Sequence, residues 1–340
     1  MNSGQRGGRR FGSVAAFVVP RLLLLLAAAC LGFLFAEVIG DPVGQMLPPD
    51  ATLADRLAMR RTLGLDQPAP VRLLAFLGRL LAGDLGVSWR SAAPVASLIA
   101  EALPVTLDMA LLGVAGALGI AVPLAVHLAT RPEAASSKVL SAIVLTALAL
   151  PVFVSGLLLM SVLAAWLGWL PAVGRGDTVS IGGWTTGLLT ISGLASLVMP
   201  AATIACALAG QFTQILTSEL ENILRQPYIA AAHARGLPPS RVHYMHALAN
   251  AWPPLIGALH VQFGNVLVFA IVTETVFERQ GLGLLFLRAA NDADMPVVAA
   301  LVVLAALVFT VLGLIGDTVL YFASPRLREP AASDDNLEAR

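Results

Sequence analysis

Three histidines lie close together in one charged stretch of the chain, residues 228–254, which reads YIAAAHARGLPPSRVHYMHALANAWPP. His233, His243 and His246 could bind a metal ion through their imidazole nitrogens. Metal sites usually add carboxylate or thiolate ligands at close spacing, and the nearest acidic residues lie well upstream of this stretch. We therefore predict no metal site here and interpret the histidines as solvated or interface residues.

Motifs of the common enzyme classes are missing from the sequence. A P-loop needs a lysine in the pattern G-x4-G-K-S/T, and the single lysine of this chain, Lys138, follows a serine instead. The sequence also has no G-x-S-x-G, no H-E-x-x-H and no Cys–His pair in a plausible context. We therefore expect no catalytic residue, no bound cofactor and no ATP hydrolysis in this chain.

The composition indicates a membrane protein. Of the 340 residues, 57% are hydrophobic and only 12% are charged, and the formal net charge is zero. The mean hydropathy is +0.81. A soluble domain normally spends about a quarter of its residues on charged side chains, so most of this surface must face lipid. The balanced charge gives no electrostatic case for a nucleic-acid partner.

Six apolar segments are long enough to cross a bilayer, which takes roughly 20 mostly apolar residues. They are residues 17–39, 103–130, 139–168, 195–217, 254–277 and 297–322. Small residues at Gly113, Gly116 and Gly119 favour close helix packing in the second segment. The predicted fold class is therefore all-α, a polytopic membrane protein with six transmembrane helices.

The predicted spans divide the chain into parts of different character. Residues 1–39 hold the N-terminus and the first span, and residues 40–101 are expected to form an outward-facing cap of short helices. A peripheral helix on the membrane surface would fit the same pattern. Residues 102–322 hold a five-helix core with one long loop at 217–253. The polar, proline-containing tail at 323–340 is expected to be disordered.

Arginines are distributed unevenly between the loops. If the N-terminus is inside, the inner segments carry most of them, and the short outer loops, including the Gly-rich loop at 168–187, carry few. Both termini and the long loop are therefore predicted to be cytoplasmic. The first apolar run could instead be a cleaved signal peptide, or a lipoprotein signal ending at Cys30. Because the run continues to the length of a full span, an uncleaved helix is favoured.

The long loop has the composition of two short helices at an angle. Tyr228–Arg235 is rich in alanine, Gly236 is well placed as the residue that ends a helix, and prolines follow. Ser240 is predicted to cap a second helix, in which Val242 and Met245 share one side. Linking two spans normally needs only a handful of residues. The extra length predicts a docking surface for another protein.

On these residues the chain resembles the inner-membrane permeases of ABC importers, in the dipeptide/oligopeptide/nickel branch. The coupling-loop signature of that branch is matched by Y-x5-A-R-G-L-x3-R-V-x3-H-A-L-x-N-A-x-x-P, and the likeness extends over residues 20–328. Other matching motifs follow in order: GDPVGQML (40–47), LGLDQPAPV (63–71), GDLGVSW (83–89), LPVTLDMAL (103–111), ALPVFVSGLLL (149–159), WLPAVG (169–174), VTETVFERQGLGLL (272–285) and D-x3-Y-x3-PR from Asp317 to Arg326.

The resemblance implies the type I ABC importer permease fold in a bacterial inner membrane, with residues 40–101 as a small periplasmic cap. It also implies that the long loop couples the chain to a cytoplasmic ATPase through residues at the matching positions: Tyr228, Ala232, Arg235, Gly236, Leu237, Arg241, His246 and Asn250. The general importer signature begins Glu-Ala-Ala, but Ala230 stands first here, so no acidic contact is expected there. Asp108 and Glu274, near the outer ends of their spans, are candidates for the mouth of the pathway.

The implied partners are a second homologous permease subunit, two cytoplasmic ATPase subunits that bind ATP and magnesium, a periplasmic or tethered solute-binding protein, and the lipid bilayer. The implied solute is a di- or oligopeptide. Nickel, glutathione or another small solute carried by the same scaffold is the alternative. A stand-alone secondary carrier or channel and a purely structural membrane scaffold remain as alternatives from other classes.

Overall fold

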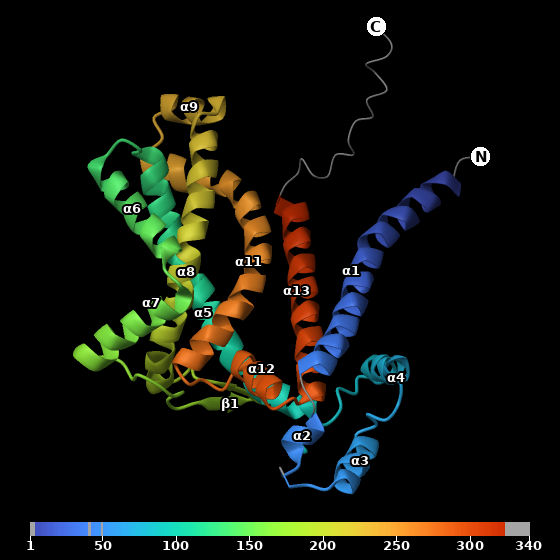
Figure 1. The fold of residues 1–340 in the computed structure, drawn as a ribbon. Helices are drawn as coiled ribbons and strands as arrows, with labels where there is room; N and C mark the ends of the chain where they lie inside the picture. Colours follow the sequence, from blue (N-terminus) through green and yellow to red (C-terminus); the bar gives the residue numbers. More distant parts are fainter. Residues whose placement is uncertain (1–3, 40–41, 49, 324–340) are drawn as a thin grey trace. The chain divides into compact units, whose positions relative to one another are not determined.

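The computed structural model describes residues 4–39, 42–48 and 50–323, and these residues are mostly helical (Figure 1). The elements in chain order are α1 Gly4–Ile39, α2 Pro42–Met46, α3 Leu53–Thr62, α4 Ala69–Leu81, α5 Val95–Thr130, α6 Ala135–Ala149, α7 Val152–Leu159, the π-helix η1 Met160–Trp166, β1 Val179–Ile181, β2 Trp184–Thr186, α8 Ile191–Leu224, α9 Pro227–Ala234, α10 Pro239–Arg241, the π-helix η2 Val242–Ala247, α11 Leu248–Val276, α12 Leu282–Asn291 and α13 Met295–Ala323. The predicted all-α class is confirmed. The tail predicted to be disordered lies, from residue 324 onward, outside the described residues.

The described residues contain several helices that can cross a membrane. By length and composition three of the described helices qualify, at Val95–Thr130, Ile191–Leu224 and Met295–Leu320, and up to five if each of two bent pairs counts as one span. The first predicted span falls in α1, Gly4–Ile39. One bent pair joins Pro239–Leu259 to Val261–Val276 at 53°.

The segment 139–168, predicted as one span, consists of two helices joined at a sharp bend. The chain bends by 107° between Ala135–Ala149 and Val152–Trp166. Pro151 explains the break, because a prolyl ring crowds the residue before it out of helical geometry. Leu150 accordingly has an extended backbone, with φ −76° and ψ 127°, and Pro151 then caps α7.

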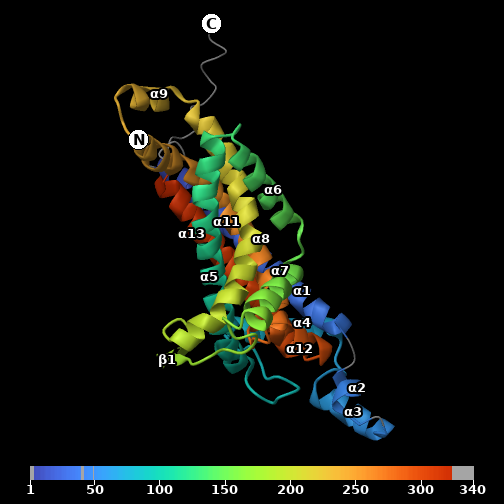
Figure 2. The same ribbon diagram turned by 90° about the vertical axis from the view of Figure 1, so that its left-hand side faces the viewer.

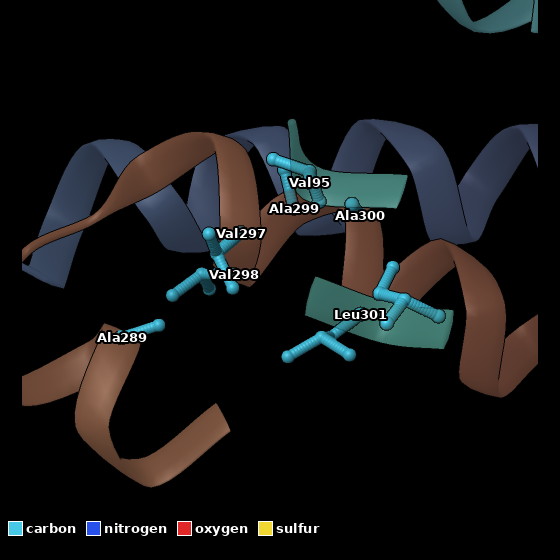
Figure 3. Packing of buried hydrophobic residues seen from close by; sticks show 8 residues of the cluster. Val95, Ala289, Val297, Val298, Ala299, Ala300 and Leu301 are labelled. Atoms are coloured by element: carbon cyan, nitrogen blue, oxygen red, sulfur yellow. The ribbon is translucent and has the colours of Figure 1, made fainter. Parts of the chain in front are cut away.

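The chain folds as two compact units, which we describe separately. The first comprises Met1–Asp108, Val173–Ser196 and Ala270–Thr310. Its apolar core joins the start of α5 to α12 and the first turns of α13, where Val95, Val297 and Val298 are fully buried beside Ala289 (Figure 3). Helix α1 packs closely here, since a Cβ atom at Gly32 would lie 3.2 Å from Val302 Cβ.

The region predicted as a cap holds α2, α3 and α4, all in the first unit. Helix α3 begins with a capping box, in which the Asp55 amide donates to Thr52 Oγ1 at 3.2 Å and the Thr52 amide donates to Asp55 Oδ2 at 3.1 Å. Helix α4 lies against α1, and its Arg72 Nη2 donates to Glu37 Oε2 at 2.7 Å. Residues 95–101 are the first turns of the long helix α5.

The predicted loop at 168–187 contains a small antiparallel hairpin. Strand β1 pairs with β2, and Ile181 lies opposite Trp184. The two residues between them, Gly182 and Gly183, have φ angles of 57° and 87°. A two-residue hairpin turn with positive φ at both positions favours glycine, because a Cβ atom is strained in that conformation.

The second unit comprises Met109–Ala172, Leu197–Phe269 and Val311–Arg340. Within it α5, α6 and α8 run side by side (Figure 2), and small residues bring them together. A Cβ atom at Gly113 would lie 2.7 Å from Ile204 Cγ2, and one at Gly116 would lie 3.3 Å from Ala205 Cβ. The predicted packing role is confirmed for these two glycines, but a Cβ atom at Gly119 would meet nothing within 4 Å.

Candidate functional site

The long loop forms an ordered element in the second unit, residues 225–250, which we call the α9–η2 element. Helix α8 continues to Leu224, past the predicted end of its span, and α9 begins with Pro227. Proline suits the first turn of a helix, because its φ is already helical and its missing N–H would have no partner there. Figure 1 shows α9 as a short helix beyond the end of α8.

The end of α9 follows the prediction closely. Gly236 has a φ of +72°. Its amide donates to the His233 carbonyl at 2.9 Å, and the Leu237 amide donates to the Ala232 carbonyl at 3.4 Å. This pair of bonds is a Schellman motif, which satisfies the last carbonyls of a helix and favours glycine at the left-handed position. The predicted helix end at Gly236 is confirmed.

The prediction that Ser240 caps a second helix is wrong. The capping residue is Pro238, with ψ 142°, and Pro239 is the first helical residue. The pyrrolidine ring of Pro239 fixes its own φ and restricts Pro238 to an extended backbone, so the two prolines start the helix together. The second helix was also predicted to be short and separate. Instead, α10 continues through η2 directly into α11.

The π-helical turn η2 changes which residues share a side. Val242 is fully buried, whereas Met245 is 62% exposed, so the predicted shared side is wrong. In a π-helix the hydrogen bond joins residues five apart, which brings Val242 and Ala247 to the same side. Both are buried, and His246 between them is half-buried.

Three buried side chains hold the element together, and the sequence analysis did not single out two of them, Ile229 and Ala247. Ile229 of α9 is 2% exposed, and Val242 and Ala247 of η2 are fully buried, in a place where α9 lies against η2. Ile229 sits in an alanine-rich run, and an isolated branched apolar residue there could have indicated a buried contact.

The residues predicted to contact a partner lie mostly on the outer surface of the element. Ala232, Leu237 and His246 are half-buried, and the other five are exposed: Tyr228, Arg235, Gly236, Arg241 and Asn250. Tyr244 and Met245 are exposed beside them. The surface therefore offers aromatic and apolar side chains together with two arginines, a composition typical of protein interfaces.

The histidines of the element form a loose group. The rings of His233 and His243 are 6.3 Å apart in an edge-on arrangement. Asn250 Nδ2 donates to the His246 carbonyl at 2.7 Å. Within the described part of the chain, no three His, Cys, Asp or Glu residues are grouped closely enough to hold a metal ion.

The two residues predicted near the pathway mouth, Asp108 and Glu274, both lie in the first unit and both are buried. Asp108 is 2% exposed, and its Oδ2 accepts hydrogen bonds from Thr186 Oγ1 at 2.8 Å and from the Gly187 amide at 3.3 Å. Asp108 therefore fixes the end of the β1–β2 hairpin to α5. This bond pattern gives the carboxylate a structural function.

Glu274 fixes a second loop in the same unit. The Glu274 side chain is fully buried; its Oε1 accepts from Thr106 Oγ1 at 2.6 Å, and its Oε2 accepts from the Leu284 amide at 2.8 Å. Thr106 Oγ1 in turn accepts from the Leu282 amide at 2.8 Å. Since Leu282 and Leu284 stand in the first turn of α12, Glu274 and Thr106 together satisfy free amides at the start of that helix.

Arg279 lies in the turn between α11 and α12 and is 2% exposed. Its Nη1 donates to the Gly174 carbonyl at 2.8 Å and to the Ser196 carbonyl at 3.3 Å. Burial and the nearby Arg175 lower the pKa of the Arg279 guanidinium to about 10, while the charges of Asp108 and Glu274 act in the opposite direction. Arg279 therefore stays cationic at neutral pH.

We call Thr106, Asp108, Glu274 and Arg279 the Arg279 network. It joins the start of α5, the end of α11 and the loop before β1, all within the first unit. The sequence analysis identified two of its four members but not Arg279. The signal available was the motif VTETVFERQGLGLL, in which a charged Glu-Arg pair follows an apolar helix.

Comparison with known families gives a match over most of the chain. Residues 121–329 match the family model described as the binding-protein-dependent transport system inner membrane component. This range includes the whole α9–η2 element, together with Glu274 and Arg279 of the network.

Individual relatives match over nearly their full length. The oligopeptide transport system permease protein AppB of Bacillus subtilis is 33% identical over 323 residues, covering 92% of this chain and 99% of AppB. The glutathione transport system permease protein GsiC of Salmonella choleraesuis is 30% identical over 317 residues, covering 92% of this chain and 98% of GsiC. Among solved structures, the MetNI methionine ABC transporter in an inward-facing conformation matches with a TM-score of 0.52 and 18% identity, covering 67% of this chain and 96% of that chain, which shows a shared fold.

Proposed function

We propose that this chain, which belongs to the binding-protein-dependent transport system inner membrane component family, is a transmembrane permease subunit of an ATP-driven ABC importer. As a family member it is an inner-membrane component of a transport system. The relatives AppB and GsiC are both permease subunits by name. The finer proposal is that the chain forms part of the pathway for a small solute and is driven by a separate ATPase.

The observation that carries this proposal is the surface of the α9–η2 element. Its outer side presents Tyr228, Arg235 and Arg241, while its inner side is fixed by the buried Ile229 and Val242. Such an element can transmit movement. A partner that binds its outer side would move the element together with the apolar helix α11, into which it continues. The apolar and aromatic side chains would fill a groove on the partner, and the arginines would set the register at its rim.

In this proposal ATP and magnesium bind to the partner ATPase, and the permease contributes no catalytic group and no cofactor site. Binding of ATP closes the ATPase subunits, which moves the coupling element and opens the pathway outward, and hydrolysis resets it. The proposed partners are a second homologous permease, two ATPase subunits and a solute-binding protein. Both termini and the α9–η2 element are proposed to be cytoplasmic, in keeping with the arginine distribution.

The proposed solute is a short peptide. One similar permease is named for oligopeptides and another for glutathione, which is itself a modified tripeptide. Nickel or another small solute is the alternative on the same scaffold. For Asp108 and Glu274 we propose an indirect role at the pathway mouth, in which they hold the hairpin and α12 in place, since both carboxylates are buried and hydrogen-bonded.

The test is a valine at Gly236, measured in the assembled transporter reconstituted into liposomes. A β-branched residue is strained at a φ of +72°, so α9 should lose its C-terminal cap. Gly83 is a matched control, because it has a φ of +76° and ends α4 with the same pair of backbone bonds, from Gly83 to Leu80 and from Asp84 to Arg79. We expect Gly236→Val to abolish ATP-driven uptake while the chain still inserts, and Gly83→Val to retain uptake.

Normal uptake by the Gly236→Val transporter would contradict the coupling role. The alternative of a stand-alone carrier is tested in the same liposomes. A carrier should take up solute without any ATPase subunit and should stop when an ionophore collapses the ion gradient. An importer should require the ATPase and ATP, and should be insensitive to the ionophore.

A further inference from the structure

A cavity of about 210 Å³ lies in the first unit, and no member of the Arg279 network lines it. It is bordered by α1, the turn after α3, helix α4, the segment before α5 and the start of α13. Part of its lining is aromatic and consists of the half-buried Phe33, Phe76 and Trp89, with the rings of Phe33 and Phe76 centred 6.0 Å apart. An apolar lining of this kind receives a hydrocarbon group.

Charged side chains of both signs line the same cavity. Arg72 and Arg79 come from α4, Glu37 comes from α1, and Asp84 stands just after α4. Arg79 and Asp84 are exposed at the rim, whereas Arg72 and Glu37 are half-buried. Two cations and two anions balance, so the lining suits a ligand that carries one charge of each sign better than a bare anion or cation.

Arg72 is only partly satisfied by its neighbours. One nitrogen, Nη2, donates to Glu37 Oε2 at 2.7 Å. Its Nε is buried, and no atom of the described residues accepts a hydrogen bond from it. A buried donor without an acceptor is costly, and a guanidinium can bind a second planar oxyanion with its remaining N–H groups.

The size of the cavity limits the ligand. Pockets for drug-sized ligands usually span roughly 300–1,000 Å³, and this one is smaller. We propose that the cavity binds a small zwitterion with an apolar group, its carboxylate or phosphate on Arg72 and Arg79 and its ammonium on Glu37 and Asp84. A short peptide and the headgroup of phosphatidylethanolamine share this chemistry.

The experiment uses the purified full-length chain without ATPase subunits, so its failure would leave the proposed importer role untouched. In one arm, the dipeptide Ala-Phe is titrated by calorimetry into the chain held in phosphatidylglycerol nanodiscs. N-acetyl-Ala-Phe and Ala-Phe-amide, each lacking one charge, are titrated in parallel. In the other arm, native mass spectrometry measures retained phosphatidylethanolamine against phosphatidylglycerol.

Two variants test the position of the ligand. Arg79→Gln removes a rim charge, and Ala75→Leu, on the exposed side of α4, fills the cavity while keeping a good helix former. Arg79→Gln should weaken binding by roughly tenfold, the loss expected for a charge-assisted hydrogen bond, and Ala75→Leu should weaken it at least as much by occupying the space of the ligand. Arg61→Gln is the matched control, because Arg61 is an exposed arginine of α3 that does not line the cavity.

The arm that responds identifies the source of the zwitterion. The inference is supported if the chain binds Ala-Phe or phosphatidylethanolamine and if both Arg79→Gln and Ala75→Leu weaken that binding. Loss of either charge on the probe should weaken it too, and Arg61→Gln should not. Absence of binding in both arms overturns the inference. So does binding that survives Arg79→Gln and Ala75→Leu unchanged, or binding as tight for the single-charge probes.

Discussion

The α9–η2 element and the Arg279 network each fix a loop between helices, but they do so by different bonds. In the element the fixing bonds are local and use the backbone, from the amides of Gly236 and Leu237 to α9. In the network they use side chains and join distant segments, as between Glu274 and Thr106 or from Arg279 to the loop before β1. The element keeps its arginines exposed, whereas the network buries its charged side chains.

This difference predicts how each region responds to substitution. An exposed side chain can be changed at little cost to folding, because water takes the place of its partners. Removal of one member of a buried network leaves the other members without partners in a site that excludes water. Substitutions in the network should therefore reduce stability first, and substitutions on the element should reduce coupling first.

The largest effect is expected for Arg279→Leu. Leucine fills part of the space but leaves the carbonyls of Gly174 and Ser196 without their donor, and Asp108 and Glu274 without the nearby cation. Breaking a buried charged group of this kind costs about 3–5 kcal/mol. We expect a large drop in the melting temperature of the purified chain in detergent, and poor recovery from the membrane.

Arg288 offers the control for this prediction. It lies on α12, close in sequence to Arg279, but its side chain is exposed. Arg288→Leu should melt within a few degrees of the original protein. Equal melting temperatures for the Arg279 and Arg288 variants would show that the network does not hold the first unit together.

A smaller effect is expected for Glu274→Gln. The amide keeps the shape and one acceptor oxygen, but its NH2 group faces one of the two donors, Thr106 Oγ1 or the Leu284 amide. Loss of one buried hydrogen bond with an unpaired donor costs about 1–3 kcal/mol. Glu278, in the same motif, is exposed, so Glu278→Gln is the control and should leave the melting temperature unchanged. A Glu274 variant as stable as the Glu278 variant would contradict the assignment.

The same difference explains what could be predicted from the sequence. The end of α9 at Gly236 was predictable because a glycine followed by prolines defines a local conformation. The network could not be predicted, because Arg279 and Gly174 are far apart in the sequence and no local pattern indicates that they are in contact. Asp108 and Glu274 stood out only as charges in apolar helices, which indicates importance but not the partners.

The errors in the predicted helices each arise from one or two residues. The periodicity of apolar residues does not reveal changes that local. Pro151 lies inside the predicted span 139–168, and it breaks the helix at Leu150. The insertion of a π-helical turn at η2 shifted Met245 to the outside, and nothing in the spacing of apolar residues indicates such a turn. Two helix starts are chemically reasonable in this segment, one with Ser240 as the capping residue and one with Pro239 as the first helical residue. The structure has the second, so Pro238 is the capping residue.

The smallest effect on stability, and the sharpest test of the comparison, is expected for Arg235→Gln. Arg235 is exposed on the α9–η2 element, and glutamine is as good a helix former. The free energy of unfolding should change by no more than about 0.5 kcal/mol. ATP-driven uptake in reconstituted liposomes should fall severalfold, because the proposed rim contact with the ATPase is lost.

Arg225 is the matched control, because it is exposed just after α8 and is not one of the proposed contact residues. The Arg225→Gln variant should transport normally. If the Arg235 variant transports as well as the Arg225 variant, this arginine does not contact the ATPase; if instead it melts as early as the Arg279 variant, the contrast between the two regions is wrong.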